Sequence, residues 1–206
     1  MTEFHYIIVG AGSAGCVLAN RLSADPEIRV LLIEAGGSDR HLLVRMPTAL
    51  SYPMAMSRFN WGYFSEPEPG LDNRRISCPR GKGLGGTSSI NGMVYVRGQK
   101  QDYDHWAQLG CTGWSYEDVL PMFKRMENFD GGEDEHRRRG GPIRITEAAK
   151  VTPFYDLVIQ SAVNLGIPRN PDSNGGDQEG VAMAQGSIHK GRRPSTAGCY
   201  LEPARA

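Results

Sequence analysis

The chain has 206 residues, a length that suits one ordinary domain or two small ones. Its 23 basic and 23 acidic residues cancel, so no net field favours nucleic acid or acidic substrates as partners. The four cysteines lie far apart without the spacing of zinc ligands. We therefore expect a reduced intracellular protein with no metal site, in which each cysteine is a small apolar filler.

The N-terminus lacks the basic segment of a secretory signal. The apolar run at residues 6–9 is too short for a signal or a membrane span. We expect a soluble, cytoplasmic chain, and a peripheral contact with the inner membrane stays open.

The same apolar run predicts a buried parallel strand. Gly10, Gly12 and Gly15 follow it, residues 16–22 have helical apolar spacing, and residues 29–33 form a second apolar run. Glu34 ends that run, 19 residues after Gly15. This order predicts a Rossmann βαβ unit that binds a dinucleotide, and it disfavours the alternative of a glycine-rich turn without a ligand.

In such a unit Gly10 permits the tight turn, Gly12 admits the pyrophosphate to the backbone, and Gly15 lets the helix pack on the strand. The helix N-terminus offers N–H groups to the phosphates, and Glu34 is placed to accept hydrogen bonds from the ribose hydroxyls. The cofactor contacts predicted in this segment are Gly10, Gly12, Ser13, Ala14, Gly15, Glu34 and Ala35.

A second glycine cluster lies at residues 80–92 and leads into Thr87, Ser88 and Ser89. Such a loop predicts a nest of backbone donors and a helix start suited to an anion. A long dinucleotide needs a second clamp of this kind. An ordinary glycine-rich loop is the alternative.

The run from Gly81 to Asn91, with Tyr95, Gly98 and Asp104 after it, resembles the first signature of the glucose–methanol–choline (GMC) oxidoreductases. These are FAD-dependent alcohol oxidases and dehydrogenases. Residues 91–98, 60–61 and 102–106 look most like the branch of choline and aliphatic-alcohol dehydrogenases, and the resemblance runs from residue 6 to the last residue.

The resemblance implies that residues 84–88 lie along the pyrophosphate and ribityl chain of FAD, and residues 91–94 beside the isoalloxazine ring. Some members tether FAD through a histidine immediately before the motif asparagine. Ile90 stands at that position here, so we expect noncovalent FAD. The cofactor contacts predicted in this segment are Leu84, Gly85, Gly86, Thr87, Ser88, Asn91, Gly92, Met93 and Val94.

Several local patterns predict further elements. Trp61 and Tyr63 alternate like strand residues, and core packing is the favoured interpretation over substrate contact. Residues 102–109 suit a helix capped by Asp102 and ended by Gly110. Residues 115–118 resemble a capping box, and Pro121 is expected to split or restart the helix that follows.

Farther along, the basic run at residues 136–139 predicts a solvated loop rather than a phosphate or membrane contact. Residues 143–145 alternate like an edge strand, residues 152–165 suit a helix stopped by Gly166 and Pro168, and residues 181–185 suit a strand. The five histidines form no recognisable catalytic arrangement and are expected to be structural or exposed.

The predicted fold class is α/β: a Rossmann-like FAD-binding domain in residues 1–141 and the beginning of a mixed α+β substrate-binding domain in residues 142–206. Similar family members run to more than twice this length, and their catalytic histidine lies near the far C-terminus. We therefore expect the chain to be an N-terminal fragment or a truncated product that contains no catalytic residue. Alone it would expose apolar sheet faces and a strand edge, so we expect poor solubility or weak FAD binding.

The resemblance implies FAD-dependent oxidation of a primary alcohol, choline-like or aliphatic, to an aldehyde, with the hydride passing to flavin N5. The expected partners are the small alcohol and an electron acceptor, a quinone-type or other carrier in preference to oxygen, and no nucleic acid. The alternatives are an NAD-dependent dehydrogenase, a non-redox FAD lyase of the same fold, and a catalytically inactive FAD-binding remnant.

Overall fold

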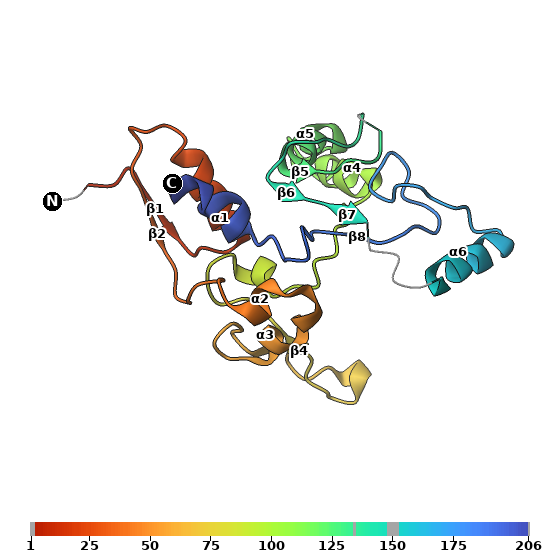
Figure 1. The fold of residues 1–206 in the computed structure, drawn as a ribbon, viewed down its shortest axis with the longest axis horizontal. Helices are drawn as coiled ribbons and strands as arrows, with labels where there is room; N and C mark the ends of the chain where they lie inside the picture. The colour runs from red at the N-terminus through yellow and green to blue at the C-terminus, as the bar shows by residue number, and fades with distance from the viewer. Residues whose placement is uncertain (1–2, 134, 148–152, 206) are drawn as a thin grey trace. The chain divides into compact units, whose positions relative to one another are not determined.

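The computed structural model describes residues 3–133, 135–147 and 153–205 (Figure 1). Contacts divide the chain into two compact units, one formed by residues 1–93 with 188–206 and the other by residues 94–187. The boundary predicted at residue 141 separates a cofactor-binding region from a substrate-binding region rather than two compact units. It stays a prediction. The helices and strands are β1 (Tyr6–Val9), α1 (Ser13–Leu22), β2 (Val30–Ile33), α2 (Leu42–Arg45), α3 (Ser51–Ala55), β3 (Tyr63–Phe64), β4 (Ser77–Cys78), α4 (Lys100–Gln108), α5 (Tyr116–Met126), β5 (Glu127–Asn128), β6 (Ile143–Arg144), β7 (Thr146–Glu147), α6 (Phe154–Asn164) and β8 (Gln185–Gly186).

The first unit begins with the predicted strand–helix–strand order. β1 and β2 pair in parallel, with Tyr6 opposite Val30 and Val9 opposite Ile33, and α1 is the crossover between them. Figure 1 shows the C-terminal helical turn, Ala197–Leu201, beside α1. The Asn20 side chain of α1 donates to the Tyr200 carbonyl at 2.9 Å and ties the two together. The βαβ prediction is confirmed.

The β1–β2 pair leaves apolar surface open. Ile8 is buried, but Ile7 is 63% exposed and Val9 83% exposed. In the described part of the chain no third strand joins this pair. The predicted exposure of apolar sheet surface is confirmed, and solubility stays a prediction.

Residues 41–82 form a small subsidiary core and a hairpin. Val44, Phe59 and Ile90 pack together in the core, while β3 and β4 pair antiparallel. The rings of Trp61 and Tyr63 stack with centroids 6.2 Å apart on this hairpin, as strand alternation predicts. Both are exposed, so the core-packing interpretation is wrong: a two-stranded ribbon has no layer covering this face among the described residues.

The second unit contains the pair α4 and α5, whose N-termini are both closed by capping boxes. In α4 the cap is Gln99, and Asp102 is the third helical residue, whose side chain accepts from the Gln99 N–H. The prediction of Asp102 as the cap is therefore wrong by three positions. The capping box of Ser115 and Asp118 at the start of α5 is confirmed.

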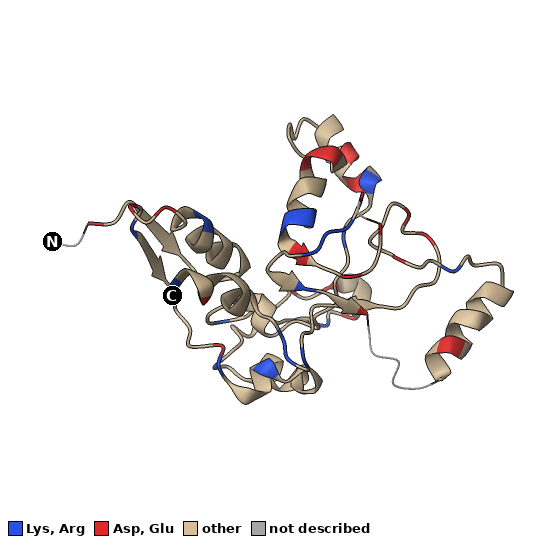
Figure 2. Cartoon of the chain, turned by 45° about the horizontal axis from the view of Figure 1, so that its top comes forward, with Lys and Arg blue, Asp and Glu red and all other residues tan. Residues whose placement is uncertain are grey.

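Pro121 lies inside a continuous α5 and does not split it. Proline removes one N–H donor, a cost that other features of the helix offset. Acidic side chains stand in the first turn of α5 and basic ones, Lys124 and Arg125, in the last (Figure 2). This arrangement complements the helix dipole and supports the helix through the proline.

The short strands of the second unit match the predictions in part. β5 pairs in parallel with β6, and β7 pairs antiparallel with β8. The strand expected at residues 143–145 is confirmed over Ile143–Arg144. The strand expected at residues 181–185 begins only at Gln185; Val181 forms an isolated bridge with Arg169 instead.

Helix α6 confirms the prediction for residues 152–165, although residue 152 lies outside the described residues. Asp156 is its single charged residue, visible as one red band in Figure 2. Phe154 and Leu157 are exposed while Ile159 is buried, so the apolar side of α6 is covered only in part. Within the described residues, none of the helices combines the length and the apolar character needed to cross a membrane.

A buried cluster of charges occupies the second unit. Arg137, predicted to lie in a solvated loop, is 1% exposed. Its Nε donates to Glu127 at 3.1 Å, and its Nη2 donates to Gln185 at 3.0 Å. Arg97 forms an ion pair with the same Glu127 at 2.8 Å. The solvated-loop prediction is wrong for Arg137, because a carboxylate 10 residues earlier supplies the countercharge.

None of the four cysteines forms a disulfide. Cys16 is fully buried in α1, as expected of an apolar filler. Cys111 is exposed, so the same expectation is wrong there. Cys111 lies in the turn after α4, where no element covers it in the described structure.

Candidate cofactor-binding site

The first glycine cluster forms the turn between β1 and α1. Gly10 has a φ of +98°, a left-handed conformation that favours glycine, and its N–H donates to Ile33 at 2.7 Å. A Cβ on Gly15 would lie 1.9 Å from the Gly10 carbonyl oxygen, so only glycine fits there. A Cβ on Gly12 would meet nothing within 4 Å. Space for a ligand is therefore open against the Gly12 backbone.

The N-terminus of α1 is available to an anion. No side chain of the described residues caps it, and its first turn contains no acidic residue. Ser13 and Ala14 are exposed. The first N–H groups of a helix have no intrahelical partner and carry a partial positive charge. A pyrophosphate fits this donor set.

Glu34 connects the end of β2 to the glycine turn. Its Oε2 accepts from the Ala11 N–H at 2.7 Å, and its Oε1 accepts from the Gly36 N–H at 2.8 Å. A carboxylate offers about four acceptor positions, so Glu34 keeps capacity for two hydroxyl groups. Its ribose contact stays a prediction, as does that of the exposed Ala35.

The second glycine cluster lies directly against the first. Gly85 donates its N–H to the Ala11 carbonyl at 2.8 Å, and Leu84 donates to Gly37 at 2.9 Å. A Cβ on Gly86 would come within 2.8 Å of the Gly12 Cα. Residues 86–89 form one 3₁₀ turn rather than the start of an α-helix. Segments some seventy residues apart thus form one cradle lined by backbone.

Residues 195 and 196, near the end of the chain, form hydrogen bonds with this cradle and its surroundings. The sequence patterns did not predict these contacts. Ser88 Oγ donates to the Gly85 carbonyl at 2.6 Å and accepts from the Thr196 N–H at 3.0 Å. Ser195 Oγ donates to the buried Asp39 at 2.5 Å. The adjacent hydroxyl residues 195 and 196 are the available sequence signal, but nothing local identifies partners more than a hundred residues away.

The turn after the cradle contains the remaining predicted contacts. Asn91 Oδ1 accepts from the Met93 N–H at 3.1 Å, and Met93 has a φ of +60°. Gly92 is exposed. Val94 belongs to the other compact unit, so it is the predicted site residue that the structure does not group with the rest. The Ile90 side chain is buried in the subsidiary core.

Two buried titratable side chains lie behind these turns. The Cys16 thiol donates to the Ala11 carbonyl at 3.2 Å, and burial raises its pKa. Burial lowers the pKa of Arg193 to about 10. Arg193 donates to the Asn91 and Val44 carbonyls at 2.6 and 2.9 Å. The sequence reasoning did not single out this arginine.

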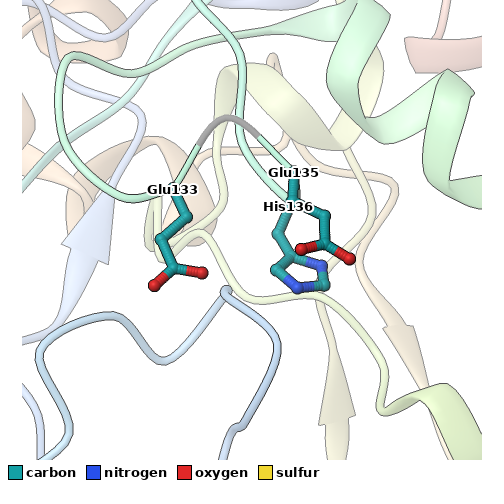
Figure 3. Close-up of side chains that lie close together, drawn as sticks. All are labelled: Glu133, Glu135 and His136. Carbon is teal, nitrogen blue, oxygen red and sulfur yellow. The ribbon is translucent and has the colours of Figure 1, made fainter.

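A separate group of side chains lies in the second unit. Figure 3 shows Glu133, Glu135 and His136, whose potential ligand atoms lie within 4.8 Å of one another. Both glutamates are exposed, on a loop. Exposed carboxylates are common at such spacings without an ion, so we assign no metal to this group.

Comparison with protein families gives a match over nearly the whole chain. The GMC oxidoreductase family model matches residues 4–206. A protein named oxygen-dependent choline dehydrogenase from Rhizobium etli (strain CIAT 652) is 51% identical over 199 residues, which is 97% of this chain and 36% of that protein. A protein of the same name from Photobacterium profundum is 50% identical over 205 residues. The chain thus spans about 36% of the length of these relatives.

Solved structures give the same picture. Pyridoxine 4-oxidase from Mesorbium loti superposes with a TM-score of 0.92 at 35% identity, over 99% of this chain and 40% of that one. An FAD-dependent oxidoreductase from Chaetomium thermophilum superposes with a TM-score of 0.88 at 32% identity, over 98% of this chain and 36% of that one.

Proposed function

Because this chain belongs to the GMC oxidoreductase family, we propose that it forms the FAD-binding part of an enzyme that oxidises a primary alcohol to an aldehyde. The observation that carries the proposal is the contact between the two glycine clusters, where Gly85 donates to Ala11 at 2.8 Å. One cluster alone would serve any dinucleotide. Two clusters in one backbone-lined cradle suit the longer path of FAD, which disfavours an NAD-dependent dehydrogenase.

In this proposal each segment of the cradle holds one part of the cofactor. The N-terminus of α1 binds the pyrophosphate through residues 12–15, and Glu34 accepts from the adenosine ribose. Residues 84–88 follow the pyrophosphate and the ribityl chain, and residues 91–94 border the isoalloxazine ring. FAD, when bound, supplies a two-electron acceptor for the substrate hydride. The chain's own contribution is to bind and orient the cofactor, and we assign no catalytic base among its residues.

The names of the relatives support choline as the first alcohol to test and oxygen as an acceptor to test beside a quinone-type carrier. Aliphatic primary alcohols form the second substrate class. The similarity to a pyridoxine 4-oxidase, whose name also implies oxidation at an alcohol, supports the reaction class rather than one substrate.

The first experiment loads the purified protein with FAD, removes free cofactor and records the flavin absorbance. We expect a yellow protein that releases its flavin on acid denaturation, since Ile90 stands where a tether would need histidine. Flavin that stays on the acid precipitate would contradict the noncovalent proposal. Because weak binding by this chain would be lost when free cofactor is removed, only a protein that binds no FAD even in titration with excess cofactor would contradict the cofactor itself.

The second experiment adds choline or an aliphatic alcohol without oxygen to the FAD-loaded product of the complete coding region. Bleaching of the flavin absorbance would support an alcohol oxidoreductase. A bound flavin that no alcohol bleaches would contradict it and favour a non-redox lyase or an inactive FAD-binding remnant.

A further inference from the structure

Arg193 carries a buried positive charge without a buried negative partner. It is 5% exposed, and its hydrogen bonds go to uncharged oxygens of residues 44, 88 and 91. Among the described residues no carboxylate forms an ion pair with it. The pKa of about 10 leaves it charged at neutral pH. Burying an unpaired charge is costly, so the contacts of this guanidinium are of interest.

One of these contacts determines how the Asn91 side chain is turned. Asn91 Oδ1 accepts from Arg193 Nη1 at 2.8 Å and from the Met93 N–H at 3.1 Å. A guanidinium and a backbone N–H can only donate. The atom between them must therefore be the amide oxygen.

The amide nitrogen of Asn91 consequently faces the other way. Among the described residues Nδ2 donates to no protein acceptor, and it is not one of the buried side-chain atoms without a partner. Asn91 is partly exposed, so Nδ2 remains available as a donor. Arg193 thus makes one end of Asn91 an internal acceptor and leaves the other end as a donor for a ligand.

We propose that Arg193 is a positioning residue that locks the Asn91 amide so that Nδ2 donates to the flavin ring. This rests on the proposed function, in which Asn91 borders the ring. Two-electron reduction of the flavin adds negative charge to its ring nitrogens and carbonyl oxygens. A fixed donor favours that charge, whereas a reversed amide would present oxygen and oppose it. The pair therefore raises the flavin reduction potential.

The test measures the two-electron reduction potential of bound FAD by dye equilibration in the FAD-loaded protein. Asn91→Asp keeps the shape but places a carboxylate oxygen toward the ring, so we expect a more negative potential. Arg193→Met frees the amide and should shift the potential in the same direction. Arg193→Lys keeps a charged donor and should restore the potential toward the original value.

Asn20→Asp provides the matched control, since Asn20 lies in the same unit and its side chain donates to the Tyr200 carbonyl rather than to the turn at residues 91–93. We expect it to change stability without changing the potential. Unchanged potential in an FAD-loaded Asn91→Asp variant would overturn the inference even if Arg193→Met fails to fold. An unsubstituted protein that binds no FAD would overturn the proposed function as well, and the two failures are thereby distinguishable.

Discussion

The two compact units hold their loops together by different physical means. In the first, the two glycine clusters meet backbone to backbone, and a Cβ on Gly86 would come within 2.8 Å of the Gly12 Cα. In the second, Arg97 and Arg137 surround the fully buried Glu127. The first arrangement depends on glycine at the points of backbone contact, and the second depends on carboxylates that offset the charge of the buried arginines. Each should therefore fail under a different kind of substitution.

The largest effect is expected from Glu127→Gln in the second unit. The change removes the carboxylate that pairs with Arg97 and leaves Arg137 with Asp172 alone, so it should cost about 4 kcal/mol of unfolding free energy. Denaturant unfolding measures it. Asp130→Asn is the control, because Asp130 pairs with Arg144 at an exposed position, where ion pairs contribute little. Equal effects of the two substitutions would contradict the role given to the buried cluster.

The next effect is expected from Gly15→Ala in the cradle. A methyl group 1.9 Å from the Gly10 oxygen must displace the turn, at a cost of about 3 kcal/mol. The loss should appear as a lower melting temperature before any cofactor is added. A variant that melts like the original protein would show that the turn moves freely, and that the cradle is not preformed.

Gly12→Ala separates binding from stability in the same cradle. Gly12 has extended backbone angles, and a Cβ there meets no protein atom within 4 Å. Stability should change by less than about 0.5 kcal/mol. The methyl group would hold the pyrophosphate away from the backbone, so FAD affinity should fall about tenfold. Fluorescence titration measures it, and unchanged affinity would contradict the proposed position of the pyrophosphate.

The smallest effect at neutral pH is that of Cys199 in the first unit, which destabilises the fold only at alkaline pH. Burial raises the pKa of this thiol from 9.0 to about 11. Since the folded form holds the proton more tightly, its contribution to stability is complete below pH 9 and is lost as pH rises toward 11. Cys199→Ser should remove that part of the alkaline destabilisation. At pH 8 a thiol reagent should label the exposed Cys111 of the second unit before the half-buried Cys199, and the reverse order would contradict this difference in exposure.

Local sequence patterns correctly predicted the structural elements whose formation depends on adjacent residues. The βαβ order, the capping box at Ser115 and helix α6 all follow from spacing within a few residues. The predictions that were wrong concern which side chains are buried. Trp61 is exposed because its hairpin has no covering layer in the described structure, and Arg137 is buried because Glu127 neutralises it. Neither outcome can be inferred from the residues beside them.

The same difference separates the residues of the candidate site that were predicted from those that were not. Both glycine clusters and Glu34 were identified from the sequence because backbone approach to phosphate requires glycine at particular positions. Arg193 and the hydroxyl residues 195 and 196 were missed, since their partners lie more than a hundred residues earlier.

The sequence by itself determined the family, the two glycine-rich turns and the order of the first strand, helix and strand, because each depends on short-range spacing. Tertiary structure alone decided that the two turns form one cradle, that Glu127 and Arg137 are buried together, and that Arg193 orients the Asn91 amide. These features arise from contacts between distant segments, and only the folded backbone brings their donors within reach of their acceptors.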